Sequence, residues 1–283
     1  MGKVSIVTDS SADVPAQTAE ALGIRMIPLN VMFGRQVFRD RVDITPQEFY
    51  RKLRQAKELP TTSQPSAGDF VELYRELGES ADAIVSIHIS TELSGTLKSA
   101  HAARAQLDGP HAIHIVDSRT TSMGLGLMVL AAAEMAQQGL EAPEIVQHVS
   151  ALVPRMNVLF VVDTLEYLHR GGRIGGAERL LGTVLSFKPL LHIHDGRVDA
   201  LQKARTKRRA TARLLDIMEE RIGRGKQACI AVLHGDAQEE AVSLRDEIQL
   251  RFSCKELHLC EVCPALGVHT GPGLVGAAFY VPE

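Results

Sequence analysis

The chain of 283 residues has no tryptophan, and its aromatic residues make up only 4% of the total. A surface that stacks nucleic-acid bases needs aromatic rings, so this composition argues against one. The formal net charge of −3 gives no general attraction to nucleic acid either. The hydrophobic fraction of 45% and the charged fraction of 23% are typical of a globular protein with a core, built here from Leu, Val, Ile, Ala and Met.

No hydrophobic run is long enough to cross a bilayer. The longest run without a charged residue spans about residues 123–133 and ends at Glu134. The N-terminus begins with a strand-like pattern and shows no signal peptide, and Ile6 stands where a myristoylation motif requires Ser or Thr. We therefore expect a cytoplasmic protein.

Cysteine is also scarce, with only four residues in the chain. A disulfide scaffold has a much higher density in a shorter chain. Cys260 and Cys263 have the spacing of a metal or redox pair, but their segment alternates like a strand, on which residues three apart point to opposite faces. We expect no metal site here, and we expect Cys229 to be a small core residue.

Several catalytic and nucleotide-binding motifs are missing. The sequence has no P-loop, no His-Glu-x-x-His helix and no Gly-x-Ser-x-Gly nucleophile elbow. The glycines of residues 171–176 have the wrong spacing for a dinucleotide fingerprint. We therefore expect no cofactor.

Strand and helix patterns alternate through the first half of the chain. The expected strands are residues 4–7, 25–33, 83–89 and 112–116, and the expected helices begin near residues 15, 45, 66, 95, 122 and 143. A capping box at Thr45–Glu48 marks one of these helix starts, and Ser66–Asp69 opens another helix. Such alternation predicts a parallel sheet with helices on both faces.

The second half has a different pattern, beginning after Pro154. Two apolar segments, Leu190–His194 and Arg197–Leu201, flank Asp195-Gly196, which favours a type I′ hairpin turn. Further strands are expected at residues 158–162 and 228–233 and near the C-terminus, with helices at residues 207–222 and 238–250. We predict an α/β protein of two domains: residues 1–154 form three α/β/α layers around a parallel sheet, and residues 155–283 contain a mixed sheet.

Hydroxyl- and glycine-rich loops occur at four places: Thr8–Asp13, Thr61–Ser66, Ser90–Thr96 and His269–Gly273. Hydroxyls and free backbone amides at strand ends and helix starts favour an anion such as a carboxylate or phosphate. Loops after successive parallel strands lie along one edge of the sheet, where ligands bind. The pattern assigns no separate role to Thr8–Asp13.

Ser94 is the sharpest single candidate for a binding residue. We expect it to be a helix N-cap, with Gly95 and Thr96 supplying the first free backbone N–H groups, and an ordinary cap is the alternative. His269, in a Thr-Gly-Pro-Gly turn, and Arg173, in a glycine-rich loop, are suited either to a polar contact or to a structural or solvated role.

A basic run, Lys203–Arg209, is of a kind associated with nucleic acid, although a solvated helix start explains it as well. Positive charge is unfavourable at a helix N-terminus. We therefore expect at least one residue of the run, with Arg205 the first candidate, to have an anionic partner.

Six motifs in order make the chain similar to a known family. They occupy Thr8–Pro15, Thr62–Ser66, Leu93–Thr96, Leu165–Ile174, Lys188–Leu191 and His269–Gly273. Together they resemble the DegV family of bacterial fatty-acid-binding proteins, of the FakB type that serves a fatty acid kinase. The resemblance implies a parallel-sheet domain, a mixed-sheet domain and one long-chain fatty acid between them.

The resemblance also implies roles for single residues. Thr62 and Ser94 would bind the carboxylate, and Arg173, Arg205 and His269 would lie near the head group. The protein would present the acid to a separate ATP-dependent kinase for acyl-phosphate formation, which feeds phospholipid synthesis, and would carry no catalytic residue itself. A transient contact with a membrane or an acyltransferase is part of this picture.

Glu92 departs from the family pattern, which often has a smaller residue there, and an acid at this place weakens carboxylate binding unless it points away. One alternative function is a lipid hydrolase with Ser94 as nucleophile, His269 as base and Asp9 or Asp117 as the orienting acid. A nucleic-acid binder acting through Lys203–Arg209 is a third hypothesis, which the net charge disfavours.

Overall fold

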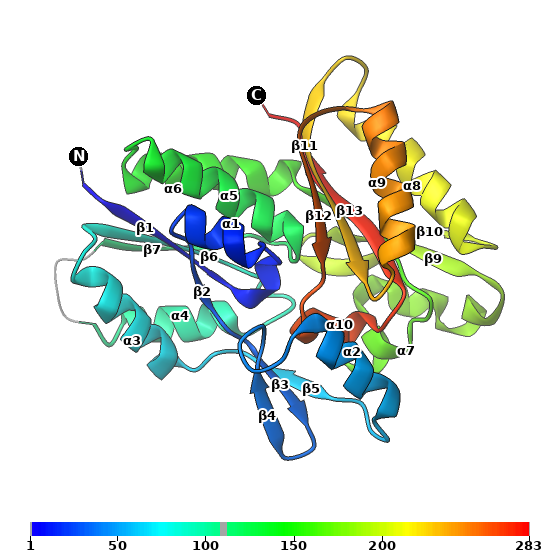
Figure 1. Ribbon diagram of the computed structural model, residues 1–283, viewed down its shortest axis with the longest axis horizontal. Coiled ribbons are helices and arrows are strands. Elements are labelled where there is room, and N and C mark those ends of the chain that lie inside the picture. Colours follow the sequence, from blue (N-terminus) through cyan, green and yellow to red (C-terminus); the bar gives the residue numbers. More distant parts are fainter. Residues whose placement is uncertain (1, 108–111, 283) are drawn as a thin grey trace.

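The computed structural model describes residues 2–107 and 112–282. It contains a four-stranded, a three-stranded and a six-stranded sheet (Figure 1). The strands are β1 (Val4–Asp9), β2 (Arg25–Ile27), β3 (Asn30–Phe33), β4 (Gln36–Arg39), β5 (Thr61–Ser63), β6 (Ala83–His88), β7 (Ala112–Asp117), β8 (Asn157–Val161), β9 (Lys188–His194), β10 (Arg197–Ala204), β11 (Gln227–Gly235), β12 (Ser253–Glu261) and β13 (Leu274–Tyr280).

The helices are α1 (Ala16–Ala21), α2 (Pro46–Gln55), α3 (Ala67–Gly78), α4 (Thr96–Arg104), α5 (Met123–Gln137), α6 (Ala142–Leu152), α7 (Glu166–Arg170), α8 (Lys207–Ile222), α9 (Gln238–Arg251) and α10 (Pro264–Thr270), with 3-10 segments η1 (Ser10–Ala12), η2 (Val153–Arg155) and η3 (Gly175–Ser186). Eight of these helices that the structure describes match the predicted ones, whereas α7 and α10 were not predicted. The predicted capping box at Thr45 is present, and the structure adds a second one at Ser66. Thr45 and Ser66 each accept a hydrogen bond from the backbone N–H group three residues on. Within the described residues, no helix combines the length and hydrophobicity needed to cross a membrane.

The parallel sheet has the strand order β2-β1-β6-β7, with helices on both faces. Ile84 and Val85 are neighbours on β6 and both fully buried: Ile84 packs with Phe70 and Tyr74 of α3, and Val85 belongs to the core of α5 and α6. Opposite faces of one strand are therefore both covered, which confirms the predicted three layers.

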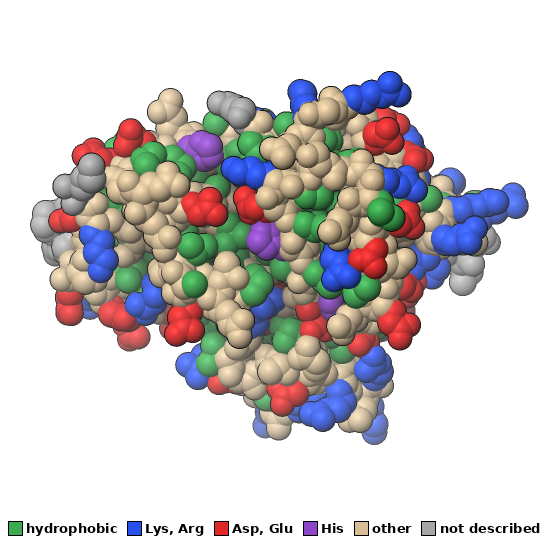
Figure 2. Space-filling view, turned by 45° about the horizontal axis from the view of Figure 1, so that its top comes forward, with side chains coloured by type: hydrophobic (Ala, Val, Ile, Leu, Met, Phe, Trp, Pro, Cys, Tyr) green, Lys and Arg blue, Asp and Glu red, His purple; other side chains and the backbone are tan. Residues whose placement is uncertain are grey.

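The three-stranded sheet was not expected. Residues 25–33 were predicted as one strand, but they form β2 of the parallel sheet and β3 of a separate antiparallel sheet with the order β4-β3-β5. Pro28 lies between the two strands, and proline cannot donate to a sheet ladder. This sheet and α2 form the lower lobe of the molecule, over which Lys and Arg side chains gather in Figure 2. Its third strand, β5, carries Thr62.

The mixed sheet has the order β10-β9-β8-β13-β11-β12, and only β11 and β12 pair in parallel. The predicted hairpin joins β9 to β10, and its turn residues Asp195 and Gly196 have φ values of 48° and 80°, as a type I′ turn requires. Val232 packs with α8 and α9 on one face, and its neighbours Ala231 and Leu233 belong to the core that contains α5. The mixed character of this sheet is confirmed.

Helix α5 lies between the parallel and the mixed sheet and contacts strands of both. Its residues 123–130 are all buried, as expected for a helix that is hydrophobic on every side. Strands up to β7 form the parallel sheet and strands from β8 onward form the mixed sheet. The division of the chain into domains near residue 154 stays a prediction.

Close packing of α5 gives a test of this arrangement. A β-carbon at Gly126 would lie 2.4 Å from the carbonyl oxygen of Ala12. We expect Gly126→Ala to lower the free energy of unfolding by about 1–3 kcal/mol, measured by urea denaturation. Gly68→Ala in α3 is the control, because its β-carbon would meet only Ser66 Oγ at 3.5 Å. The control should leave stability unchanged or raise it by about 0.4–1 kcal/mol. Equal stability of both variants would contradict the packing.

Candidate functional site

A cavity opens where the carboxyl ends of β6 and β7 meet the mixed sheet and the three-stranded sheet. It encloses about 840 Å³ when the open solvent at its mouth is included. Most of the lining is aliphatic or aromatic, including Val158, Phe160, Val198, Leu233 and Leu274. Strand ends of a parallel sheet are the expected place for a ligand.

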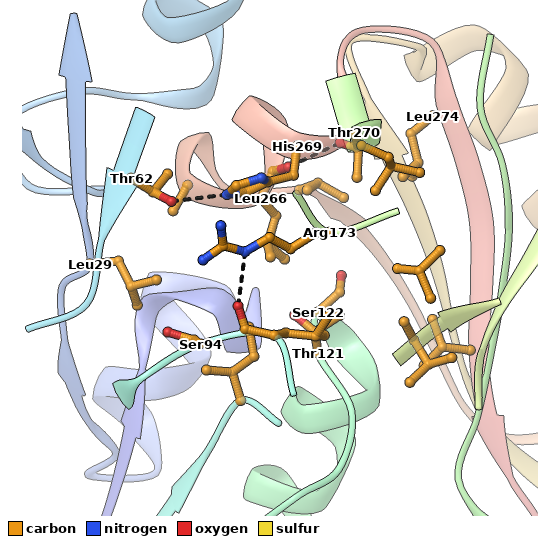
Figure 3. Close-up of a pocket in the computed structure, with 18 of the residues that line it drawn as sticks. Leu29, Thr62, Ser94, Thr121, Ser122, Arg173, Leu266, His269, Thr270 and Leu274 are labelled. Carbon is orange, nitrogen blue, oxygen red and sulfur yellow. Dashed lines mark hydrogen bonds between the residues drawn. The ribbon is translucent and has the colours of Figure 1, made fainter. Parts of the chain in front are cut away.

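Polar side chains occupy one side of this cavity (Figure 3). Thr62, Ser94, Arg173 and His269 all line it, so the structure brings together four residues that the sequence singled out. In Figure 3 the guanidinium of Arg173 lies between Thr62 and Ser94. The cavity therefore combines an apolar body with a compact polar end that carries one positive charge.

His269 lies in the last turn of α10, not in the turn that the sequence predicted. Pro264 starts this helix as a favourable first residue, and the helix continues through Thr270 before the glycines. The imidazole Nε2 of His269 is 2.9 Å from Thr62 Oγ1, which joins α10 to β5. Burial, with a smaller effect from Arg173, lowers the pKa of His269 to about 4. The imidazole is therefore neutral at pH 7.

The direction of the hydrogen bond between His269 and Thr62 depends on which ring nitrogen of the neutral imidazole carries the proton. With the proton on Nε2, His269 donates to Thr62 Oγ1, and the Thr62 hydroxyl hydrogen is left to donate into the cavity. Nδ1 of His269 is buried and has no hydrogen-bond partner among the described residues. Arg173 donates from Nε to the carbonyl of Leu93 at 3.1 Å and from Nη1 to that of Gly171 at 2.8 Å, which fixes its orientation.

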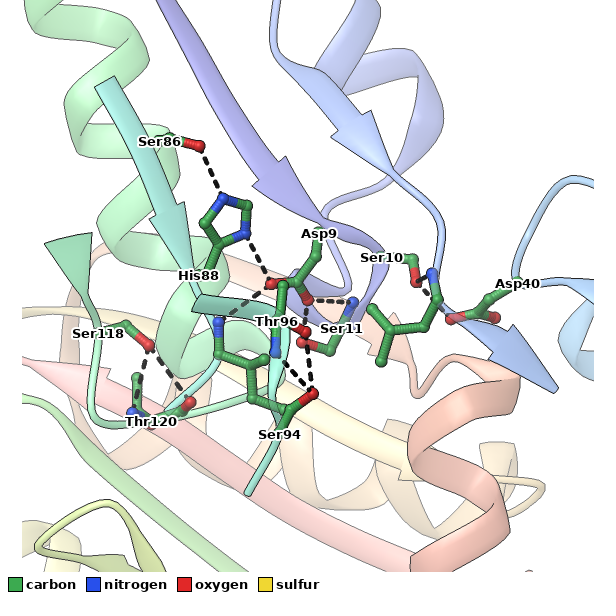
Figure 4. Close-up of polar contacts among 12 residues, drawn as sticks. Asp9, Ser10, Ser11, Asp40, Ser86, His88, Ser94, Thr96, Ser118 and Thr120 are labelled. Carbon is green, nitrogen blue, oxygen red and sulfur yellow. Dashed lines mark hydrogen bonds and ion pairs between the residues drawn. The ribbon is translucent and has the colours of Figure 1, made fainter. Parts of the chain in front are cut away.

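Ser94 is not the N-cap of α4, and this prediction is wrong by one residue. The N-cap is Gly95, and Ser94 Oγ accepts a hydrogen bond from Thr96 N at 3.3 Å and lies 2.9 Å from Thr96 Oγ1 (Figure 4). A serine hydroxyl that reaches the N–H two residues on forms a local turn before the helix begins. Gly95 and Thr96 do not line the cavity, and the fully buried Thr96 supports Ser94 from behind.

Arg205 is exposed at the junction of β10 and α8 and does not line the cavity. The expected anionic partners of the basic run belong to Lys207 instead. Lys207 Nζ lies 3.8 Å from Asp163 and also pairs with Glu240. Lys207 is the first residue of α8, so these carboxylates offset the unfavourable charge at the helix N-terminus.

Glu92 points away from the cavity. Its carboxylate accepts a hydrogen bond from Arg197 Nε at 2.6 Å, and Glu92 is not a lining residue. The expected weakening of a bound carboxylate by Glu92 therefore has no structural basis.

The loop Thr8–Asp13 is structural. Asp9 Oδ2 accepts a hydrogen bond from Ile89 N at 3.0 Å and lies 3.0 Å from His88 Nδ1, while Oδ1 accepts from Ser11 N at 3.1 Å (Figure 4). None of the residues of this loop lines the cavity. Asp9 instead fixes the end of β6, immediately before the segment that carries Ser94.

The hydrolase arrangement is not assembled. Ser94 bonds to Thr96, His269 bonds to Thr62, and the carboxylates of Asp9 and Asp117 are held by other groups. A Ser–His–Asp chain does exist, since Ser86 Oγ lies 2.7 Å from His88 Nε2, and His88 in turn contacts Asp9. All three residues are fully buried and none lines the cavity, so this chain holds the sheet together.

Sequence reasoning missed two polar lining residues. Thr121 and Ser122 follow β7 and line the cavity below the polar end. Ser122 Oγ also donates to the buried Asp13. The signal was present, because the same strand-end rule that selected Ser90–Thr96 applies to the residues after β7.

The α/β fold with a cavity between the parallel and the mixed sheet has close structural counterparts. The family model described as DegV, an uncharacterised protein family, matches residues 3–282. The chain therefore belongs to the DegV family.

Three solved structures resemble the chain over nearly its whole length. A DegV family protein from Thermus thermophilus, described for its fatty acid binding, has 37% identity and a TM-score of 0.94, covering 99% of this chain and all of the other. DegV from Bacillus subtilis, described as a fatty acid binding protein, has 32% identity and a TM-score of 0.92, with full coverage of both chains. A stearic acid-binding protein from Eubacterium ventriosum has 27% identity and a TM-score of 0.91, covering 99% and 98%.

The lowered pKa of His269 predicts a pH dependence of stability. Between pH 6.5 and about 4, the unfolded chain binds a proton on this residue and the folded chain does not. Protons therefore favour the unfolded state, and this contribution is lost as the pH falls. Between pH 7 and pH 4, we expect the free energy of unfolding of the natural protein to fall by more than that of His269→Gln. Urea unfolding at both pH values measures this difference. His148→Gln, at an exposed position of α6, is the control. A constant difference would contradict the buried, neutral imidazole.

Proposed function

We propose that the protein binds one long-chain fatty acid in the cavity, between residues 1–154 and 155–283, with the carboxylate at the polar end. One observation carries this proposal: the cavity is mostly apolar, and its polar residues on one side include Thr62, Ser94, Arg173 and His269. The similarity to fatty-acid-binding DegV proteins supports it. Burial of roughly 15 methylenes at about 0.8 kcal/mol each gives about 12 kcal/mol before the costs of association.

The polar end then serves to orient the ligand. The hydroxyls of Thr62 and Ser94 donate to the carboxylate, and Arg173 supplies the compensating charge. His269 in its Nε2–H form donates to Thr62 Oγ1, which directs the Thr62 hydroxyl hydrogen toward the carboxylate. Arg205 lies outside the cavity, so we propose no ligand contact for it.

The protein acts in the cytoplasm as a carrier and not as an enzyme in this proposal. It presents the carboxylate to a separate fatty acid kinase, which uses ATP to form the acyl phosphate for phospholipid synthesis. Membership in the DegV family and the lack of a nucleotide-binding motif in the sequence support this role. No cofactor is needed for it, and contact with a membrane or acyltransferase is transient.

Ligand content and kinase coupling test the proposal directly. Protein purified from bacteria should release about one fatty acid per chain on denaturation, identified by mass spectrometry. Acyl phosphate should form only when the loaded protein, the kinase and ATP are combined. Repeated lack of lipid together with no uptake of added fatty acid would exclude the binding function. Binding without acyl-phosphate formation would exclude only the kinase partnership. Stoichiometric labelling of Ser94 by a serine-directed covalent probe would favour the hydrolase instead.

Ser94→Ala tests the assignment of the head group. Loss of a hydrogen bond to a charged group costs about 1.5–3 kcal/mol, which raises Kd about tenfold to a hundredfold. Titration with a fatty acid should show this loss, and titration with the matching fatty alcohol should show a smaller one. Ser150→Ala, an exposed serine on α6, is the matched control. Unchanged affinity for the acid would remove Ser94 from the site.

A further inference from the structure

The tip of the β9–β10 hairpin fastens the mixed sheet to the loops of the parallel sheet. Arg197, the first residue of β10, donates from Nε to Glu92 in the loop after β6 at 2.6 Å. Arg119, in the loop after β7, donates from Nη2 to the carbonyl of Asp195 at 2.7 Å. One tip therefore joins the loops that follow two neighbouring strands.

The backbone of the turn lies directly on the loop after β6. Gly196 has a φ of 80°, and a β-carbon on it would lie 2.4 Å from Ser90 Oγ and 3.5 Å from Ser90 Cβ. Both the backbone conformation and the lack of a side chain are needed for this close approach. The contact between tip and loop is thus built into the hairpin.

Behind this contact lies the cavity. Ile193 and Val198 pair with one another across the hairpin, one residue further from the turn than His194 and Arg197, and both line the cavity. Ile89 and Leu93, from the loop after β6, line it as well. The tip and the loop therefore close one wall of the cavity between them.

This wall differs from the other connections between the sheets. Asp13, fully buried, accepts a hydrogen bond from Cys263 N at 2.8 Å, and α5 joins both sheets through a buried core. At the hairpin tip, Ile89 and Val198 also belong to that buried core, but the outermost connection is polar and open to solvent, with Arg197 64% exposed and Glu92 32% exposed. Exposed ion pairs hold weakly and are screened by salt. We therefore expect the Glu92–Arg197 ion pair to give way before the buried contacts between the sheets do.

We propose that the hairpin tip, residues 193–198, and the loop of residues 89–93 form a gate over the acyl chain, and that the Glu92–Arg197 ion pair holds it closed. The gate sets the rate at which a fatty acid enters and leaves, whereas Thr62 and Ser94 recognise its carboxylate. This inference rests on the proposed fatty-acid binding and concerns the wall of the same cavity.

Removing the ion pair tests the gate. Bound radiolabelled oleate, chased with excess unlabelled oleate at low salt, should leave Glu92→Gln and Arg197→Gln about two- to fivefold faster than the natural protein, as expected for an exposed pair. The double variant with Glu92→Arg and Arg197→Glu should restore slow release. High salt should speed release from the natural protein and leave both single variants unchanged. Arg25→Gln, which breaks the exposed Arg25–Glu76 pair between β2 and α3, is the control and should release at the natural rate.

A reversible lock gives a second, independent test. The distance of 3.5 Å between a β-carbon at Gly196 and Ser90 Cβ lies in the range of a disulfide. The double variant Ser90→Cys with Gly196→Cys should exchange oleate at least tenfold more slowly when oxidised than when reduced. The reduced form carries the same strain at residue 196. A difference in oleate exchange between the two forms therefore reports only the effect of the disulfide.

The results separate the two proposals. The gate would be overturned if the natural protein takes up oleate but neither the charge variants nor the disulfide lock changes the rate of release. No uptake of oleate by the natural protein would overturn the fatty-acid binding itself. Variants of the gate should change release of oleate and of the matching alcohol alike, because the gate contacts the chain and not the carboxylate.

Discussion

The buried carboxylate of Asp13 is the interaction on which the site depends. A charge removed from water must be paired and fully hydrogen-bonded. Asp13 meets this need with Arg41, Ser122 and the backbone N–H of Cys263, at 2.5–3.0 Å. Burial raises the pKa of Asp13, and the Arg41 guanidinium works against this rise. Each partner belongs to a different segment near the cavity: Arg41 to the lobe with Thr62, Ser122 to the start of α5, and Cys263 to the start of the helix with His269.

Local signals in the sequence predicted most of the fold. The capping box at Thr45, the Asp-Gly turn and the alternation of strands with helices act over a few residues, and the structure confirms each of them. The three-stranded sheet was missed because β5 reaches β3 across 30 residues of chain, and no local pattern encodes that pairing. The start of α4 was misplaced by one residue because a serine hydroxyl can satisfy either a turn or a helix cap.

The candidate site was also predictable only in part. Residue types and strand ends pointed to Thr62, Ser94, Arg173 and His269, which line one cavity although more than 200 residues separate the first from the last. Arg205 was placed with them by family resemblance, but the structure puts it at the exposed start of α8. The carboxylate partners of Lys207 come from β8's following loop and from α9, which a one-dimensional charge pattern cannot show. Aliphatic lining residues could not be separated from core residues by sequence, since both are hydrophobic and differ only in what they face.

The apolar surface of α5 affects whether the two halves of the chain can fold separately. Because residues 123–130 are buried on every side, this part of the helix has no face that water can solvate favourably. A fragment that ends before β8 would leave the side of α5 that contacts β11 and β13 uncovered. The parallel sheet and the mixed sheet thus share one hydrophobic core, and separation of the two exposes it to solvent and to aggregation.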